Sequence, residues 1–390
     1  MGKPQIALLL ALASAGTALT AQTTHMISGG GSALQAGLNA AVAGDTLIVQ
    51  TGVYTAVTCT EGVHIQLQPG AQVIQMPLSG TAALTFSGIA ANETAVVTGG
   101  ELDRISMLNC AGTVVADGVT FNAYPTGGSS VINSCTGPVV FVDSHTGAPG
   151  AIVRGLLHIT DSAQVSFTRC TVPYVSVTSS NVTATDTACR TEGFGQEGML
   201  INSGRVTWQG GVIQGTYNWH WPVFTEALHI IGGEFVATGG CAIESDWWFP
   251  TVTTSAIEAH GGTVRLDPSV HVSGTPPIIG TGTVITAPIP SLSTTHNGLA
   301  MTVGVASQPG NAVFTLAGLP RAPYTTPWGS AWILPTDPLL DGSLVGPSGT
   351  ITFAYNFPSV PWHFVLTLQP VALDGNGTLT IGAPQRFAWN

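Results

Sequence analysis

The segment Cys110-Ala-Gly-Thr-Val-Val115 is repeated 25 residues further along the chain as Cys135-Thr-Gly-Pro-Val-Val140. Looser copies, each with an apolar residue, a polar residue and a short valine-rich stretch, begin 18 to 29 residues apart, near Leu84, Leu108, Ile132, Ile159, Val177, Ile201, Ile230 and Ile257. Repeats of this length predict a solenoid, and the absence of a 3.6-residue helical pattern favours one built from β-strands. A β-helix keeps its strands short but tolerates loops of any length, which explains the irregular spacing.

The residue that follows most of the apolar starts is asparagine or threonine, namely Thr85, Asn109, Asn133, Thr160, Thr178 and Asn202. Such side chains, about 4.8 Å apart in successive coils, can bond to one another along the solenoid axis. We therefore expect a polar ladder. The alternative is that asparagine and threonine are simply common in turns.

The repeat also places cysteines at one angular position of adjacent coils. A spacing of about 4.8 Å falls within the range of Cα separations that a disulfide requires, so Cys110 and Cys135 are the first candidate pair. Cys170 and Cys189 are the second candidate pair. The alternative is a stack of buried thiols without a bond.

A different pattern precedes the repeats. Ser32 is expected to cap a short helix over 32–43, in which Leu34, Leu38, Ala41 and Val42 share one face. Gly44-Asp45 then turns the chain into a strand over 46–50. Because a β-solenoid exposes unpaired strand edges at its ends, a capping element is physically expected there.

This succession of a helix, Gly-Asp-Thr, three apolar residues and Gly-x-Tyr resembles the N-terminal cap and first coil of secreted right-handed parallel β-helix proteins of the pectin-lyase-like superfamily. The matching residues are Gly44, Asp45, Thr46, Leu47, Ile48, Val49, Gly52 and Tyr54. The resemblance implies an all-β, right-handed parallel β-helix (β-solenoid) with an N-terminal helical cap. That superfamily includes polysaccharide lyases, glycoside hydrolases, pectin esterases, epimerases and non-catalytic surface proteins, so it does not fix the activity.

The sequence predicts three segments. Residues 1–21 are typical of a secretory signal peptide, since the apolar run is too short to span a bilayer, and they predict a secreted, extracellular protein. Residues 22–285 are assigned to the β-helix. Residues 286–390 contain short β-like runs between Pro and Gly turns, which indicate a small β-sandwich-like domain and resemble the C-terminal β module of secreted bacterial proteins.

The charge of the chain limits its partners. Only 7% of the residues are charged, the formal net charge is −11, and the only lysine, Lys3, lies in the expected signal peptide. The mature chain is expected to be acidic and without lysine, and such a chain cannot supply the phosphate-neutralising contacts that nucleic acid requires, so nucleic acid is excluded as a partner. No segment after the signal is apolar enough to span a membrane.

Counting from the repeat starts brings three loops side by side, within residues 191–197, 217–222 and 244–250. We assign catalytic roles to the acids and the histidine in these loops, namely Glu192, Glu197, Asp246 and His220. We assign substrate binding to Trp219, Trp221, Trp247, Trp248, Tyr217 and Arg190. Indole faces suit the faces of sugar rings, paired carboxylates can divide acid and base roles, and a histidine can transfer protons near neutral pH. The alternative is that the aromatic residues only pack the loops against the solenoid.

Known catalytic signatures of the superfamily are missing from this sequence. Beyond the expected signal peptide the chain has no lysine for a lysine-based lyase mechanism. It also has no Gly-His-Gly or Arg-Ile-Lys of polygalacturonases and no Asp-Pro-His of β-helix epimerases. An arginine could still serve as the base, although each is more simply explained by an ion pair; the candidates are Arg154, Arg169, Arg190 and Arg205. No cofactor is expected, and a Ca²⁺ site, which Asp and Glu could form, has no visible liganding motif.

Two hypotheses follow from the sequence. In the first, the protein binds an extracellular polysaccharide or cell-surface glycan through the acidic, tryptophan-rich loops; if it is an enzyme, it is a polysaccharide lyase or glycoside hydrolase. In the second, it is a non-catalytic structural or adhesive surface protein, a hypothesis that the missing signatures favour.

Overall fold

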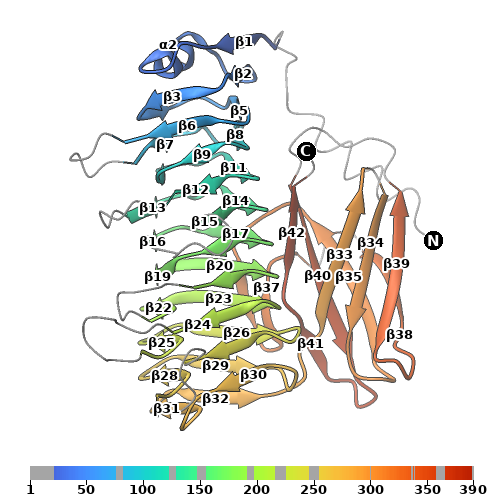
Figure 1. The fold of residues 1–390 in the computed structure, drawn as a ribbon. Coiled ribbons are helices and arrows are strands. Elements are labelled where there is room, and N and C mark those ends of the chain that lie inside the picture. The colour runs from blue at the N-terminus through green and yellow to red at the C-terminus, as the bar shows by residue number, and fades with distance from the viewer. Residues whose placement is uncertain are drawn as a thin grey trace.

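The computed structural model describes residues 22–75, 82–122, 129–146, 155–190, 197–215, 225–245, 254–298, 300–334, 337, 339–356 and 365–388. Within these residues the chain forms a parallel β-helix, capped at one end by the helix α2 (Ala33–Ala40) and flanked by an antiparallel β module (Figure 1). The fold class predicted from the repeats is thereby confirmed. Each complete coil contributes one strand to each of three parallel sheets, which we call sheets A, B and C, and β1 and β32 extend sheet A beyond the complete coils.

Sheet A contains twelve strands: β1 (Thr24–Ile27), β2 (Thr46–Val49), β5 (His64–Leu67), β8 (Thr94–Thr98), β11 (Thr113–Asp117), β14 (Pro138–Val142), β17 (Gln164–Thr168), β20 (Ser180–Thr185), β23 (Gly204–Gln209), β26 (Glu234–Thr238), β29 (Thr263–Leu266) and β32 (Thr283–Thr286). Sheet B contains ten: β3 (Gly52–Thr55), β6 (Ala71–Ile74), β9 (Glu101–Leu102), β12 (Thr120–Phe121), β15 (His145–Thr146), β18 (Thr171–Val172), β21 (Ala188–Cys189), β24 (Val212–Gln214), β27 (Ala242–Glu244) and β30 (His271–Ser273).

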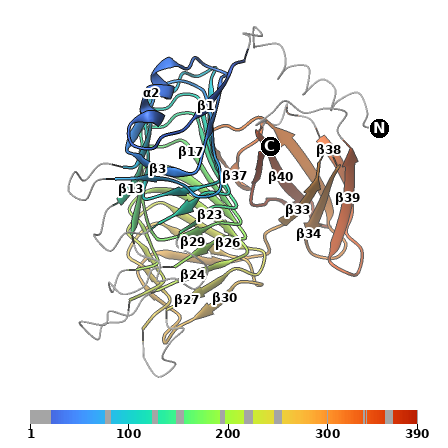
Figure 2. The ribbon, with the colours of Figure 1, turned by 45° about the horizontal axis from the view of Figure 1, so that its top comes forward.

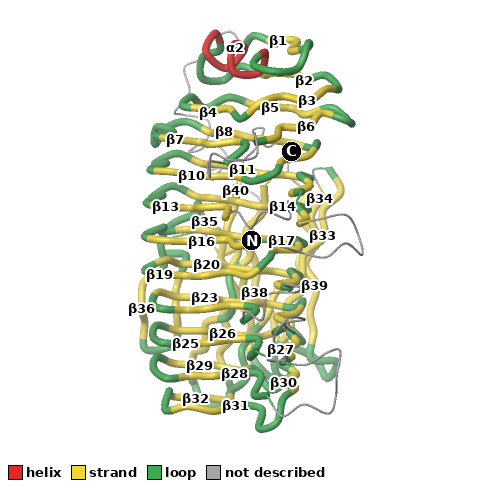
Figure 3. Tube along the Cα trace, turned by 60° about the vertical axis from the view of Figure 1, so that its left-hand side comes forward, coloured by secondary structure: helices red, strands yellow, loops and turns green. Residues whose placement is uncertain are grey.

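Sheet C also contains ten: β4 (Val57–Cys59), β7 (Leu84–Ser87), β10 (Ile105–Leu108), β13 (Ser129–Asn133), β16 (Leu156–Thr160), β19 (Tyr174–Thr178), β22 (Met199–Ile201), β25 (Leu228–Ile230), β28 (Ile257–Ala259) and β31 (Ile278–Gly280). Figure 3 shows the strands of successive coils lying one above another, with α2 at one end. These counts refer to the described part of the chain.

Alternate residues of each strand point into the solenoid and form continuous apolar columns. In sheet A one column combines large side chains with alanines, namely Val97, Ala116, Phe141, Phe167, Ala184, Trp208, Ala237 and Leu266. Phe141 and Phe167 stack with ring centroids 5.0 Å apart. Trp208 is fully buried and lies between two alanines of the neighbouring coils. The largest side chain of the column therefore lies between two of its smallest.

The predicted repeat starts are correct in the middle of the solenoid and wrong near its ends. Ile132, Ile159, Val177, Ile201 and Ile230 are partners in successive coils. Their partners further out are Met107, Phe86 and Ala259, instead of the predicted Leu108, Leu84 and Ile257. Met107 and Leu108 are both apolar, so composition could not tell which one points inward. Leu84 and Ile257 also point inward, but each lies two residues before the residue of its strand that joins this column, Phe86 and Ala259 respectively.

The polar ladder exists only in part. Asn133, Thr160 and Thr178 are partners in adjacent coils, and Asn202 donates from Nδ2 to Thr178 Oγ1 over 3.1 Å. The predictions for Thr85 and Asn109 are wrong, because Ser87 and Leu108 occupy the ladder positions. Asn109 instead adopts a left-handed backbone (φ 55°) in the following turn, a conformation that asparagine tolerates better than most residues.

All six cysteines are buried free thiols, so neither predicted disulfide is present. The Cys110 and Cys135 side chains do contact each other from adjacent coils, which agrees with the alternative of a thiol stack. Cys189 pairs instead with Val172 and Ile213 in the strand register, which excludes the second predicted pair. In the next coil a serine follows the two cysteines, and the amide of Cys135 donates to Ser162 Oγ over 3.2 Å.

The cap differs from its prediction in two details. Ser32 makes no side-chain capping hydrogen bond, and Val42 is 59% exposed because the helix ends before it. Leu34 and Leu38 are buried against the first coil as expected. Asp45 holds the cap in place, because its carboxylate accepts hydrogen bonds from the amides of Thr23 (2.8 Å) and Val42 (3.0 Å) and lies 3.0 Å from His25 Nε2.

These contacts predict a pH-dependent cap. Burial raises the pKa of Asp45, but the hydrogen bonds from Val42, His25 and Thr23 outweigh it and leave the pKa below its ordinary value. A lowered pKa contributes stability that is present above the ordinary value of about 3.9 and is lost as the pH falls through the folded-state value. We expect Asp45→Asn to lower the melting temperature at pH 6 and to have a smaller effect at pH 2. Equal losses at the two pH values would contradict this role of the carboxylate.

The C-terminal module is a sandwich of two antiparallel sheets. One sheet contains β33 (Ser291–Asn297), β34 (Ala300–Ala306) and β39 (Thr350–Asn356), and the other contains β38 (Leu339–Leu344), β35 (Ala312–Gly318), β40 (Val365–Leu373), β41 (Leu379–Ile381) and β42 (Gln385–Ala388). A hairpin of β36 (Tyr324–Thr326) and β37 (Gly329–Ala331) accompanies them. Residues of both sheets, among them Val303 and Leu368, form its separate core.

The module lies against the outer face of sheet A, as the turned view shows (Figure 2). Val365 of β40 packs on a row of outward-facing valines, namely Val96, Val115, Val140 and Val142. Glu234 on β26 accepts hydrogen bonds from Arg205 Nε (2.7 Å), Arg265 Nε (2.9 Å) and Ser330 Oγ (3.0 Å), the last of which belongs to the module. An apolar contact and a charged network therefore join the two parts.

None of the helices in the described residues has the length and the apolar character needed to cross a membrane.

Candidate functional site

The chain length of a coil varies most at one corner of the solenoid, between sheets B and C. The connection from β18 to β19 is the single residue Pro173, whereas the connection from β24 to β25 comprises residues 215–227. Most of the predicted site residues belong to such connections and lie outside the described residues. They are Glu192, Tyr217, Trp219, His220, Trp221, Asp246, Trp247 and Trp248.

The residues on both sides of the three predicted loops are described, and they align. On the sheet B side, the register of β21 with β24 places Arg190 level with Gln214, whose Nε2 donates to Glu244 Oε2 over 2.8 Å. On the sheet C side, Met199 pairs with Leu228, so Glu197 and Glu226, each two residues earlier, occupy equivalent positions. The loops 191–196, 216–224 and 246–253 therefore leave and rejoin the solenoid in adjacent coils.

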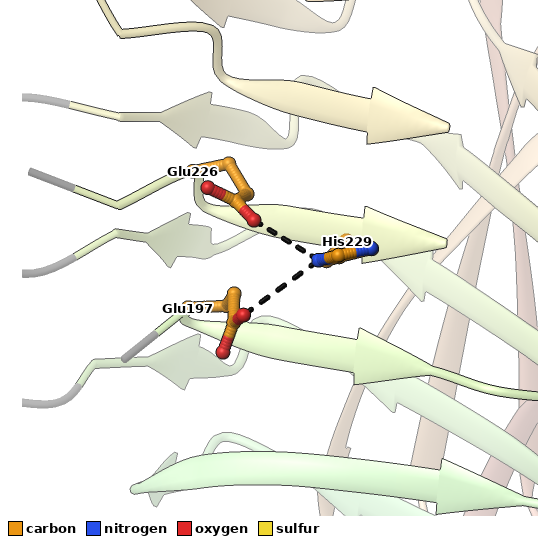
Figure 4. Close-up of side chains that lie close together, drawn as sticks. All are labelled: Glu197, Glu226 and His229. Carbon is orange, nitrogen blue, oxygen red and sulfur yellow. Dashed lines mark ion pairs between the residues drawn. The ribbon is translucent and has the colours of Figure 1, made fainter. Parts of the chain in front are cut away.

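A cluster of two carboxylates and one imidazole lies where the first two loops rejoin sheet C (Figure 4). The Nδ1 atom of His229 is 3.0 Å from Glu226 Oε1 and 3.6 Å from Glu197 Oε1. The three side chains are 19%, 15% and 27% exposed, respectively, so a molecule from solvent can reach a largely desolvated site. We call these three residues the Glu-His-Glu cluster.

The strand pattern explains why His229 points outward. In Leu228-His229-Ile230 the two apolar residues are buried, and the residue between them faces the opposite side of the sheet. The same outward row contains Leu200 before His229 and Glu258 after it. His229 was not among the predicted site residues, because it lies on a strand and those residues lie in the loops or next to them. The alternation of apolar and polar residues in β25 was the available signal.

The cluster is strongly acidic. Burial raises the pKa of Glu226, and the neighbouring carboxylates of Glu197 and Glu258 raise it further. Among the described residues, His229 is the only ion-pair partner of Glu197 and Glu226. One carboxyl that holds its proton more tightly beside a second carboxylate can divide acid and base roles, and three converging donor atoms can bind a cation.

A second histidine and carboxylate pair adjoins the cluster. His260 Nε2 lies 2.6 Å from Glu258 Oε1, and the rings of His229 and His260 have centroids 5.4 Å apart. The ring of His260 therefore packs against the ring of His229, and Glu258 holds His260 in place. They also extend the acidic surface to the next coil.

The arginines proposed as alternative bases have other partners or are exposed. Arg169 forms a bidentate pair with Asp143, and Arg205 bonds to Glu234 in the contact with the module. Arg190 is exposed on the sheet B side of the loops. Arg154 lies outside the described residues. The ion-pair explanation thus holds for Arg169 and Arg205.

Of the predicted catalytic residues, the structure describes only Glu197, which lies beside His229. It adds Glu226 and His229 as the nearest chemically capable neighbours of Glu197. No family model matches this chain, and no curated protein is similar to it in sequence.

Proposed function

We propose that this is a secreted β-helix protein of the pectin-lyase-like type that binds an extracellular polysaccharide along the corner between sheets B and C. The observation that carries the proposal is the alignment of the loop ends, in which Glu197 and Glu226 occupy equivalent positions in adjacent coils. Neighbouring strands of a sheet are about 4.8 Å apart, so the loops start in regular steps along the axis. Such a row suits an extended polymer better than a compact ligand.

The composition of the loops supports a sugar ligand. The segments joined at this corner contain Trp219, Trp221, Trp247 and Trp248, and indole rings offer flat apolar area with one polar edge. The Glu-His-Glu cluster at their base supplies acceptors for sugar hydroxyls. It also supplies the paired carboxyl groups that glycoside cleavage requires.

We expect Trp219→Ala and Trp247→Ala each to weaken polysaccharide binding about tenfold, because loss of an aromatic contact of about 1.4 kcal/mol has that effect. Retention on affinity gels, with a panel of neutral and acidic polysaccharides, measures the change. Trp328→Ala is the matched control, since this exposed tryptophan belongs to the module. Retention that is the same in wild type and in both loop variants would refute the proposal.

The same panel distinguishes an enzyme from a structural surface protein. Release of reducing or unsaturated ends by the wild type, and its loss in Glu226→Gln, would assign cleavage to the Glu-His-Glu cluster. Binding without product release would leave a non-catalytic adhesive role. The hydrogen-bonded coils, which form a rigid rod, are compatible with that second function.

A further inference from the structure

We infer that the Glu-His-Glu cluster is a binding site for a divalent transition-metal ion of the Zn²⁺ type, held by Glu197, Glu226 and His229. This inference goes beyond the proposed function and does not depend on it. One oxygen of each carboxylate and the Nδ1 atom of His229 all lie within 4.8 Å of one another. The ligands come from two successive coils, so the sheet register fixes their spacing.

The first argument is the geometry of His229. Its Nδ1 atom is buried and has no hydrogen-bond partner among the described residues, although Glu226 Oε1 is only 3.0 Å away. A buried nitrogen without a partner is costly and usually indicates an absent ligand or a catalytic role. Figure 4 shows that both carboxylates point toward Nδ1 of His229. Neither of them forms a hydrogen bond with it.

The second argument is size. Ligand atoms placed tetrahedrally about 2.0–2.1 Å from a zinc ion are about 3.3 Å apart. The observed distances from His229 Nδ1, 3.0 and 3.6 Å, lie on either side of that value. Small rotations of the two partly exposed carboxylates would complete the arrangement.

The donor set selects the class of metal. An imidazole nitrogen beside two carboxylates suits Zn²⁺ and similar ions, whereas Ca²⁺ takes six to eight oxygen ligands and Mg²⁺ prefers oxygen and water. Three protein ligands leave a fourth position open for water or for a group of another molecule. His260 would not itself bind the metal, but its ring packs against His229 and helps to fix the orientation of that imidazole.

Isothermal titration of Zn²⁺ into the full chain tests the inference, with the protein untagged and first freed of metal by dialysis against EDTA. We expect one ion per chain in the wild type, and at least tenfold weaker binding in His229→Ala and in Glu226→Gln. His158→Ala is the matched control, because His158 lies in the same outward row of sheet C, three coils away. Titration with Ca²⁺ and Mg²⁺ should give no comparable binding.

Melting temperatures with and without Zn²⁺ provide a second test, which shows whether each variant is folded. Zn²⁺ should raise the melting temperature of the wild type and of His158→Ala, but not that of whichever ligand variant is folded. The inference fails if the wild type shows no saturable binding, or if His229→Ala binds as tightly as the wild type. Because no polysaccharide is present, either outcome is independent of the glycan-binding experiment.

Discussion

Trp208→Ala is expected to lower the free energy of unfolding by about 3–5 kcal/mol, the usual loss for a fully buried tryptophan. Trp208 lies between Ala184 and Ala237 in its column, so the variant would place three alanines in succession. The hydrogen-bonded coils cannot move together to close the gap, because their spacing is set by the strand ladders. A large part of the removed volume should therefore remain as a cavity.

Denaturant titration followed by the far-UV circular dichroism of the strands measures this loss, since tryptophan fluorescence changes with the substitution itself. Trp328→Ala is the control, because this side chain is 52% exposed and its removal creates no interior cavity. If both variants unfold at the same denaturant concentration, the column does not stabilise the solenoid as described.

Glu234→Ala is expected to cost about 3 kcal/mol, the lower end of the range for removing one partner of a buried ion pair. The substitution removes the carboxylate that both Arg205 and Arg265 bond to, and it removes the acceptor of Ser330 in the module. The lower end applies because Arg265 is 43% exposed and water can solvate it. The contact between the module and sheet A should weaken with it.

Limited proteolysis within residues 287–290, between β32 and β33, reports that weakening, and thermal unfolding reports the stability. Asp143→Asn is the control, because it removes the carboxylate charge that pairs with Arg169, in a pair that is 39% and 48% exposed, for which less than about 1 kcal/mol is expected. Asparagine also tolerates the left-handed backbone of this residue (φ 46°). Equal effects of the two substitutions would show that Glu234 does not join the two parts.

The β-helix could be predicted from the sequence because the same pattern of residues recurs in successive coils. Ile132, Ile159 and Val177 recur wherever a coil must fill the same interior position, and an error at one coil is corrected by its neighbours. At Met107 and Leu108 two apolar residues are adjacent, and only the backbone decides which one points inward. The spacing of Cys110 and Cys135 likewise predicted their contact but could not determine whether the sulfurs are bonded.

The candidate site was predictable only in part, for a physical reason. The central coil starts were correct, so counting from them aligned the residues at which the predicted loops begin and end. Glu197, however, makes its contacts outside the loops, with His229 on an adjacent strand. A histidine between two buried apolar residues looks like an ordinary outward position of a strand until the register sets it beside a carboxylate.

The confinement of long connections to one corner bears on how such a protein can diverge. Adding or exchanging residues between β24 and β25 alters neither the inward columns nor the strand pairing, because both end before the connection begins. The connections at this corner can therefore change in length and sequence during evolution, one coil at a time, while the strands of the solenoid stay the same. The same property makes the corner a suitable place to graft foreign peptide segments at a regular spacing.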